Sequence, residues 1–408
     1  MSPAPAIVLI VDRLGAGWLG PYGSTWFDTP HWNALAAQSA LAEWMIASGP
    51  RLQDAYEGWL RGARPWQSPQ MPSLPERIVS HGQRAILLTD DPAVADLPQV
   101  AAFSEAQLLK QPEPTELADA IESTQLLGFF QAAADLVAQR PDAGLIWLHA
   151  RGLAGAWDAP YALRQQWADE DDPPPPSTVA PPGRHLPPDY DPDELLGYLL
   201  AYGGQIALLD QGLGLLMEAI DQASDGMQAL CLVTSPRGYP LGEHGCVGLC
   251  HQSLYEELLH VPLLVRFPHR AHALTRLQTI LQPADVYSLL VCHGGWLTPG
   301  EEAQLPCPML DELERVEVRP LAACASGPGQ RAIRTPAWFL REVQEEGELR
   351  RELFVKPDDR WEVNEVSSRC REVVEELVRL LDEWQSLSRS GPSTHLLKLS
   401  PLMWDVWR

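Results

Sequence analysis

The chain has 408 residues, and its 54 acidic side chains outnumber the 30 Lys and Arg, which gives a formal net charge of −24. Such a charge disfavours binding to DNA, RNA or an anionic membrane through general electrostatic attraction. Hydrophobic residues make up 45% of the chain, an ordinary share for a globular protein with a sizeable core. We therefore expect neither nucleic acid nor membrane among its partners.

The N-terminal segment and the cysteines bear on the cellular compartment. No basic region precedes the first apolar run, and that run is too short for a signal peptide. No window approaches the roughly 18 uninterrupted apolar residues of a transmembrane helix. The seven cysteines are odd in number and scattered along the chain, which suits a reducing compartment. We expect a cytoplasmic protein.

The first predicted strand, residues 7–11, consists only of β-branched and aliphatic residues. A run without polar alternation is typical of a strand buried on both faces of an α/β sheet. Asp12 follows directly, and sites for metals or substrates form at the carboxyl ends of such strands. A glycine-rich loop then leads into an Ala/Leu-rich helix predicted over residues 32–42.

Predicted strands and helices alternate along the next part of the chain. Strands are expected at 84–89, 144–149, 230–234 and 261–268, and helices at 53–61, 117–139, 192–223 and from about residue 282. This alternation indicates a mainly parallel sheet with helices on both faces. Residues 169–192 are dense in Asp and Pro, so we expect an insertion loop without regular structure there.

The region after residue 320 has a different pattern. Residues 332–340 and 352–357 predict two antiparallel strands, and residues 372–387 predict an amphipathic helix. We therefore expect an α/β domain over 1–300, a small α+β subdomain over 301–387 and a tail over 388–408.

Short motifs follow one another along the chain. They are the first strand with Asp12, then Leu-Gly, Gly-Pro-Tyr-Gly, Asp-Thr-Pro-His and Asn-Ala-Leu-Ala, and further on residues 234–238 (Thr-Ser-Pro-Arg-Gly), 242–245 (Gly-Glu-His-Gly), 255–257 (Tyr-Glu-Glu) and 260–263 (His-Val-Pro-Leu). This order resembles the sulfatase family of the alkaline phosphatase superfamily. A lone Gly-Glu-His-Gly would be weak, but the ordered match covers nearly the whole chain. It implies the alkaline phosphatase/sulfatase-like fold, a mainly parallel sheet flanked by helices with a small C-terminal subdomain.

The resemblance also implies a metal site that this chain has lost. Sulfatases hold a calcium ion with oxygen ligands, and in the family two adjacent acids end the first strand. Here Arg13 follows Asp12, and Pro236 and Arg237 occupy the second pair of ligand positions. Neither Pro nor Arg is a metal ligand. We therefore predict no cofactor, with Asp12 as the only remnant of the calcium site.

The nucleophile and lysine positions differ as well. The resemblance implies a formylglycine made from Cys or Ser, in a motif with Pro two residues on and Arg four residues on. Ser48 has that Pro, but its Arg comes one residue early, at Arg51. Asp90 stands where the family has a lysine, while His244 of the Gly-Glu-His-Gly motif is kept. We therefore predict a degenerate catalytic set.

An electrostatic hypothesis follows from these replacements. One acid beside two arginines cannot hold a divalent cation, which needs several negative charges close together. We predict that guanidinium groups of Arg13 and Arg237 lie near the former calcium position and pair with Asp12. Asp90 is a candidate second partner.

Three functions remain open at this point. The first is a pseudoenzyme, a sulfatase-like protein without catalysis that binds a small anionic ligand or a protein partner. The second is a sulfuric or phosphoric ester hydrolase with an altered site, in which Ser48 is the nucleophile, calcium is the cofactor and arginines 13, 51 and 237 hold the anion. The third is zinc binding by His244, Cys246, Cys250 and His251, whose spacing fits no standard pattern.

The tryptophans offer one further alternative. There are fifteen of them, and exposed indole rings would suit a surface that stacks on carbohydrate. We expect most of them in the core, as for Trp147 on a predicted buried strand.

Overall fold

The computed structural model describes residues 5–68, 71–223, 228–249, 253–297, 305–314, 323–345, 347–390 and 399–404. Within these ranges a nine-stranded sheet forms the centre of the molecule, in the order β11-β2-β10-β7-β1-β5-β3-β4, with β9 paired to β2. The strands are β1 (Ala6–Val11), β2 (Ala40–Ile46), β3 (Ala85–Thr89), β4 (Glu105–Leu108), β5 (Leu145–Ala150), β7 (Leu230–Thr234), β9 (His260–Val261), β10 (Leu263–Arg266) and β11 (Thr275–Leu281).

β1 lies inside this sheet, paired in parallel with β5 on one side and β7 on the other. Ile10 is level with His149 of β5 and with Thr234 of β7, so the carboxyl ends of the three strands meet at one edge. β10 is antiparallel to β7 and to β2. The predicted mainly parallel α/β sheet is therefore confirmed.

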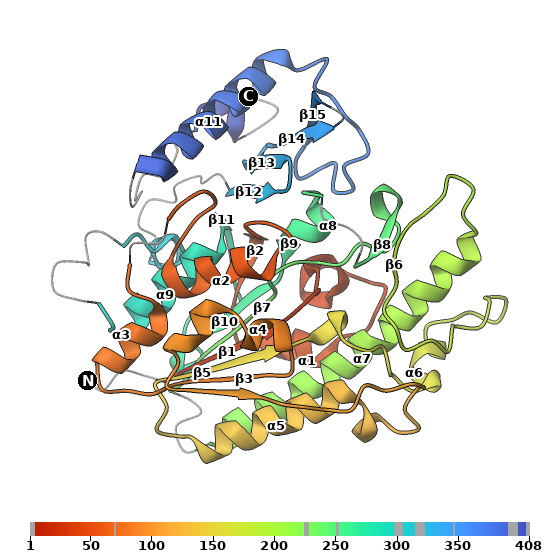
Figure 1. Cartoon of the computed structure of the whole chain (residues 1–408), viewed down its shortest axis with the longest axis vertical. Coiled ribbons are helices and arrows are strands. Elements are labelled where there is room, and N and C mark those ends of the chain that lie inside the picture. Colours follow the sequence, from red (N-terminus) through yellow and green to blue (C-terminus); the bar gives the residue numbers. More distant parts are fainter. Residues whose placement is uncertain are drawn as a thin grey trace.

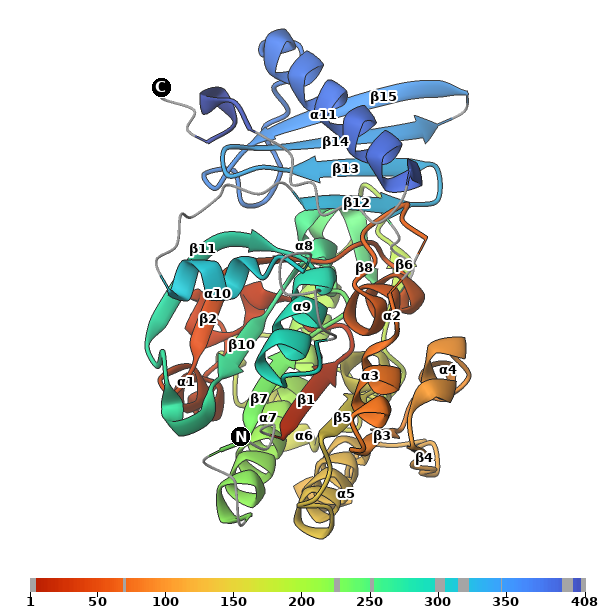
Figure 2. The ribbon, with the colours of Figure 1, turned by 90° about the vertical axis from the view of Figure 1, so that its left-hand side faces the viewer.

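Helices cover both faces of the sheet (Figures 1 and 2). On one face α5 (Gln125–Gln139) and α7 (Pro192–Gln222) share a core with Ile7, Leu9 and Val11 of β1. On the other face α2 (Leu52–Arg61), α3 (Leu74–Ser80) and α9 (Pro283–His293) share a core with Ala6, Val8 and Ile10. Because alternate residues enter different cores, β1 has no polar position.

Shorter helices complete the main body. They are α1 (Pro30–Ala36), α4 (Pro92–Ala95), α6 (Tyr161–Gln165), α8 (Glu256–Leu259) and α10 (Pro308–Leu313). Within the described ranges, no helix combines the length and the apolar character that crossing a bilayer requires.

A second, antiparallel sheet lies at one end of the molecule with α11 packed on it (Figure 2). Its strands are β12 (Ala323–Gly327), β13 (Gln330–Arg334), β14 (Trp338–Glu345) and β15 (Glu348–Val355), and α11 runs over Arg371–Ser390. Leu377, Leu381 and Trp384 of the helix share a core with Leu340 and Leu353 of the sheet.

The prediction of two strands in this region is wrong. Residues 332–340 contain the end of β13, a reversal and the start of β14. At the reversal, Thr335 Oγ1 accepts a hydrogen bond from the backbone N–H of Trp338 at 3.2 Å, and Pro336 offers no N–H to a ladder. A sequence run that looked continuous is thus a hairpin, and β12 was missed.

Two helix predictions in the main body also need correction. The helix predicted over 32–42 ends at Ala36, and β2 begins at Ala40, because a short apolar run does not distinguish a buried strand from a helix. The helix predicted from residue 117 begins at Gln125, where Thr124 caps it by accepting a hydrogen bond from Leu127 N–H.

The insertion over 169–192 is mostly irregular, as predicted, but it contributes one strand. β6 (Gly183–His185) pairs with β8 (Cys246–Gly248) in a two-stranded ribbon. The domain boundary at residue 300 stays a prediction.

Candidate functional site

The strand-end site, which comprises Asp12, Arg13, Pro236 and Arg237, lies at the carboxyl ends of β1 and β7. The Asp12 side chain is fully buried. Arg237 donates from Nε and Nη2 to its two carboxylate oxygens at 3.0 and 2.8 Å, and from Nη1 to the carbonyl oxygen of Pro50 at 2.7 Å. The predicted ion pair of Asp12 with Arg237 is therefore formed, in the two-pronged geometry that gives the strongest such bonds.

Both partners of this pair are charged. Burial opposes ionisation of Asp12, but the attraction and the hydrogen bonds of Arg237, helped by the charge of Arg13, hold the pKa of Asp12 below its ordinary value. Burial likewise opposes the charge on Arg237, and Asp12 raises the pKa of the guanidinium above its usual value. The site is thus a buried ion pair in which Arg237 supplies the positive charge.

The remaining members of the site are set by the turns that follow the two strands. Arg13 is buried and has φ of 66°, a left-handed conformation that a side-chain-bearing residue rarely adopts. The side chain of Pro236 has no donor atom for a metal. The Ser235 hydroxyl accepts hydrogen bonds from the backbone N–H groups of Leu14 (3.2 Å) and Arg237 (3.3 Å). Sequence reasoning missed Ser235, which ties the two strand ends together.

Asp90 does not join the strand-end arginines. Its carboxylate accepts a hydrogen bond from the backbone N–H of Arg151 at 2.6 Å. Burial raises the pKa of Asp90 to about 6, and that hydrogen bond only partly offsets the effect. The candidate pairing of Asp90 with Arg13 or Arg237 is therefore wrong.

Ser48 and Arg51 lie in different surroundings, one buried and the other exposed. The Ser48 hydroxyl is buried and has no hydrogen-bond partner among the described residues. Arg51 is exposed, and it donates to both carboxylate oxygens of Asp54 at 3.0 and 2.7 Å. A Cβ on Gly49 would lie 2.3 Å from the carbonyl oxygen of Ser326, so this loop is pressed against β12. Of the three arginines in the predicted anion clamp, Arg51 is thus turned to Asp54 instead of Ser48.

The sequence analysis did not identify the buried His149 as a candidate residue of the site. His149 is the last residue but one of β5, and its Nδ1 lies 2.9 Å from the hydroxyl of Tyr56 on α2. Burial lowers the pKa of His149 to about 4, so the ring is neutral at neutral pH. His149 could have been recognised from the sequence, because it is a polar residue near the carboxyl end of a buried strand, as Asp12 is.

His244 belongs to a separate cluster. Its ring stacks on Tyr255 with centroids 3.5 Å apart, and Nδ1 lies 2.9 Å from Glu257 Oε1. Burial opposes protonation of His244, but Glu257 raises its pKa above the ordinary value. Of the four residues in the zinc hypothesis, Cys250 and His251 lie outside the described residues.

The donor set does not fit a calcium ion. Across the described ranges, no three His, Cys, Asp or Glu side chains converge in a group able to hold a metal. Calcium takes six to eight oxygen ligands, whereas the carboxylate of Asp12 is engaged on both oxygens by Arg237. Both oxygens of Asp12 therefore already have a cationic partner that belongs to the chain itself.

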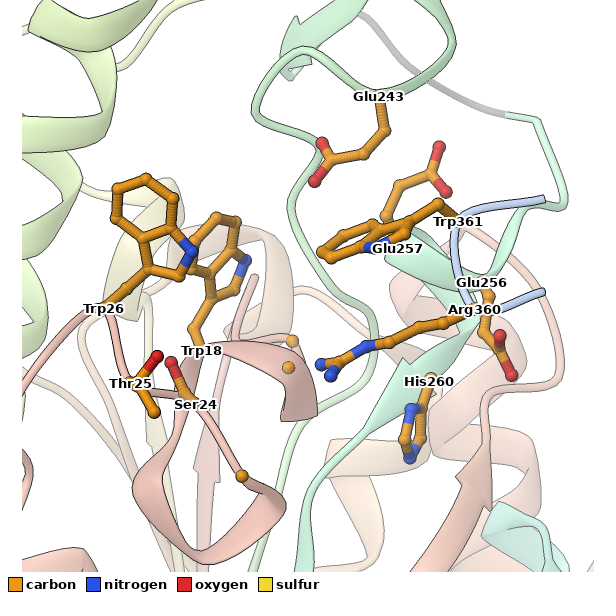
Figure 3. A pocket seen from close by; sticks show the side chains of 13 residues that line it. Trp18, Ser24, Thr25, Trp26, Glu243, Glu256, Glu257, His260, Arg360 and Trp361 are labelled. Atoms are coloured by element: carbon orange, nitrogen blue, oxygen red, sulfur yellow. The ribbon is translucent and has the colours of Figure 1, made fainter. Parts of the chain in front are cut away.

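A pocket of about 210 Å³ lies beside the strand-end site. We call it the tryptophan pocket; among the residues that line it are Trp18, Trp26, Glu243, Glu257, Arg360 and Trp361 (Figure 3). Asp12, Arg13 and Arg237 are not part of its lining. The main body and the segment between β15 and α11 both contribute to its walls.

Comparisons with known proteins address the fold. No protein-family model and no curated protein matches the sequence. Among solved structures, the yidJ protein of Bacteroides fragilis, described as a sulfatase, matches with a TM-score of 0.75 at 15% identity, over 96% of this chain and 97% of that one. The phosphonate monoester hydrolase of Agrobacterium radiobacter matches with a TM-score of 0.73 at 14% identity, over 98% and 100%.

A third structure, BT4656 in complex with its substrate D-glucosamine-2-N,6-O-disulfate, matches with a TM-score of 0.70 at 13% identity, over 96% of this chain and 99% of that one. The fold of this chain is therefore that of the sulfatase/alkaline phosphatase superfamily, as the motif order predicted.

Proposed function

We propose that this chain is a non-catalytic protein of the sulfatase fold that acts by binding a ligand or a protein partner. The observation that supports this function best is the ion pair of Asp12 with Arg237, formed by two hydrogen bonds of 3.0 and 2.8 Å. Ester hydrolysis on this fold would need a divalent cation at this position. Here the guanidinium of Arg237, which unlike a metal ion cannot dissociate, supplies the positive charge.

The geometry around Ser48 also disfavours the hydrolase alternative. A nucleophile needs a neighbouring base and access to the substrate. The Ser48 hydroxyl is buried, and within the described residues it has no hydrogen-bond partner that could take its proton. Arg51 and Arg237 are each engaged by a carboxylate, so neither is free to hold a transferring group. We propose a cytoplasmic location as well, because the seven cysteines are odd in number and scattered along the chain.

Hydrolysis assays test the proposal directly. Purified protein is incubated with 4-nitrophenyl sulfate, 4-nitrophenyl phosphate, a phenylphosphonate ester and the disulfated glucosamine on which BT4656 acts, with calcium or with a chelator. We expect no turnover above that of the Ser48→Ala variant. Turnover that calcium supports and that this substitution abolishes would establish the hydrolase instead.

Metal content gives an independent test of the same function. Elemental analysis is expected to find no stoichiometric calcium, and chelation is expected to leave the melting temperature unchanged. The variant Arg13→Asp/Pro236→Asp/Arg237→Asn restores the acid and amide ligands of the family pattern, and its melting temperature should rise with calcium. A calcium-dependent melt of the parent chain would contradict the proposal.

A further inference from the structure

The tryptophan pocket carries charges of both signs on opposite walls. Figure 3 shows Glu243 on one side and the guanidinium of Arg360 on the other, with Trp18 and Trp26 along one flank and Trp361 along the opposite flank. A ligand in this space therefore meets an acid, a base and indole rings together.

Arg360 has its charge available for a ligand. Its guanidinium carbon lies 5.2 Å from the ring centroid of Trp361, and it forms no ion pair with any residue that the structure describes. A Cβ on Gly17 would lie 2.5 Å from Arg360 Nη2, so the absence of a side chain there is what lets the guanidinium extend across the pocket. An arginine placed in this way can receive a carboxylate in two-pronged geometry.

Three acids line the pocket, and two of them already have cationic partners. Glu257 pairs with His244 at 2.9 Å, and Glu256 pairs with Lys356. Glu243 accepts a hydrogen bond from Leu241 N–H and has no ion pair within the described residues. Burial, followed by the neighbouring charge of Glu257, raises the pKa of Glu243. A ligand cation near Glu243 would favour its ionised form and so act against both effects.

The indole rings supply the apolar part of the pocket. Trp26 and Trp361 are 59% and 55% exposed, which is unusual for the largest apolar side chains. Aromatic faces attract both ammonium groups and hydrocarbon. The volume of about 210 Å³ lies below the roughly 300–1,000 Å³ of sites for drug-sized ligands, so the pocket suits a single small molecule rather than an oligosaccharide.

We propose that the tryptophan pocket binds a free amino acid with a large apolar side chain, its carboxylate on Arg360, its ammonium at Glu243 and its side chain between Trp26 and Trp361. A purely anionic ligand would leave Glu243 uncompensated, and a purely cationic one would be repelled by Arg360. The inference rests on the binding role proposed above and names its ligand class.

Buried contacts hold the wall that carries Arg360 and Trp361. Lys356 reaches Glu256 of α8 and Glu362, the latter at 2.9 Å. Glu362 in turn accepts a hydrogen bond from the backbone N–H of Glu256 at 3.0 Å. The segment between β15 and α11 is thereby fixed to the main body, so the pocket is largely formed before a ligand arrives.

Isothermal titration with three matched probes tests the proposal. L-Phenylalanine carries both charges, phenethylamine only the ammonium and 3-phenylpropanoate only the carboxylate, on the same hydrocarbon frame. We expect L-phenylalanine to bind at least about tenfold more tightly than phenethylamine or 3-phenylpropanoate. Absence of L-phenylalanine binding at about 10 mM, or equal affinity for the three probes, would overturn the inference.

Two substitutions locate the binding. Glu243→Gln and Arg360→Gln should each weaken L-phenylalanine binding about tenfold or more, whereas Arg379→Gln and Glu383→Gln, on the exposed face of α11, should leave it unchanged. Melting curves confirm that all four variants are folded. Binding that survives both pocket substitutions contradicts the site. Hydrolysis is measured separately on the ester substrates. Turnover there would refute the non-catalytic role, whereas the titration alone shows whether the pocket binds an amino acid.

Discussion

The strand-end site and the tryptophan pocket lie close together in one fold but use their charges in opposite ways. In the strand-end site Arg237 satisfies both oxygens of Asp12 inside the protein. In the pocket Arg360 and Glu243 lie on opposite sides (Figure 3), and neither forms an ion pair in the described part of the chain. Charges that satisfy one another inside the protein are unavailable to a ligand, whereas charges kept apart between aromatic rings are available to one. The following predictions test this contrast.

The largest effect is expected for Asp12→Ala. The substitution leaves the buried guanidinium of Arg237 without its partner, and breaking such a pair costs about 3–5 kcal/mol. Urea unfolding measures the change in the free energy of unfolding. Asp54→Ala removes the partner of the exposed Arg51 and should cost at most about 1 kcal/mol. Equal stability of Asp12→Ala and the parent would refute the structural role of the pair.

This cost should depend on pH in a defined direction. The pKa of Asp12 is lowered in the folded protein, so its stabilisation is present above the ordinary value of 3.8 and is lost as pH falls through the lower folded-state pKa. The difference between the parent and Asp12→Ala should therefore be constant near neutral pH and shrink only in strong acid.

A smaller effect of opposite sign is expected for Asp90→Asn. Burial raises the pKa of Asp90 from 3.8 to about 6, so the parent loses stability as pH rises through this interval. Asn imitates the protonated carboxyl and can still accept the hydrogen bond from Arg151. The variant should be more stable by about 1–2 kcal/mol at neutral pH, with allowance for partial exposure. Urea unfolding at several pH values should show the advantage disappearing in acid.

The double variant Asp12→Leu/Arg237→Met should differ from the parent by only about 1 kcal/mol. Replacing both members of a buried pair with apolar residues removes the attraction and the desolvation cost together. The comparison with Asp12→Ala in urea unfolding separates the worth of the pair from the penalty of an orphaned charge. A double variant as unstable as the single one would indicate that the hydrogen bond from Arg237 to Pro50 is indispensable.

The smallest effect on stability is expected for Trp26→Ala in the pocket. Trp26 is 59% exposed, so its removal should change the free energy of unfolding by less than about 0.5 kcal/mol. Binding of L-phenylalanine should nevertheless weaken about tenfold. Trp404→Ala, another exposed tryptophan outside the pocket lining, serves as the matched control. If both substitutions weaken binding alike, the pocket is not where the ligand binds.

The sequence predicted the strand-end site better than the pocket for a physical reason. Asp12 and Arg237 each follow a buried strand, and parallel strands place their carboxyl ends together. Pairing of these opposite charges could therefore be inferred without coordinates. Asp90 also follows a strand, yet its carboxylate accepts a hydrogen bond from the backbone N–H of Arg151. The sequence did not predict this contact, because a pattern of side chains does not show a nearby main-chain donor.

The pocket could not be predicted in the same way. Trp26 lies in a loop of the main body, Glu243 begins a single 3-10 turn there, and Arg360 lies in a segment after the last strand. No periodicity relates these positions, and their proximity depends on how β12–β15 and α11 dock on the main body. The same strands were the least well predicted part of the fold, because the turn at Thr335 divides an apparently continuous run.

Because two distant parts of the chain form the pocket, the pocket is completed late in synthesis. Trp18 is made early, whereas Arg360 and Trp361 come after more than three hundred further residues. Because domains fold as units while the N-terminal part is synthesised first, a chain whose central sheet is already complete still lacks one wall of the pocket. Binding at this pocket would therefore distinguish a fully folded chain from one in which only the main body has formed.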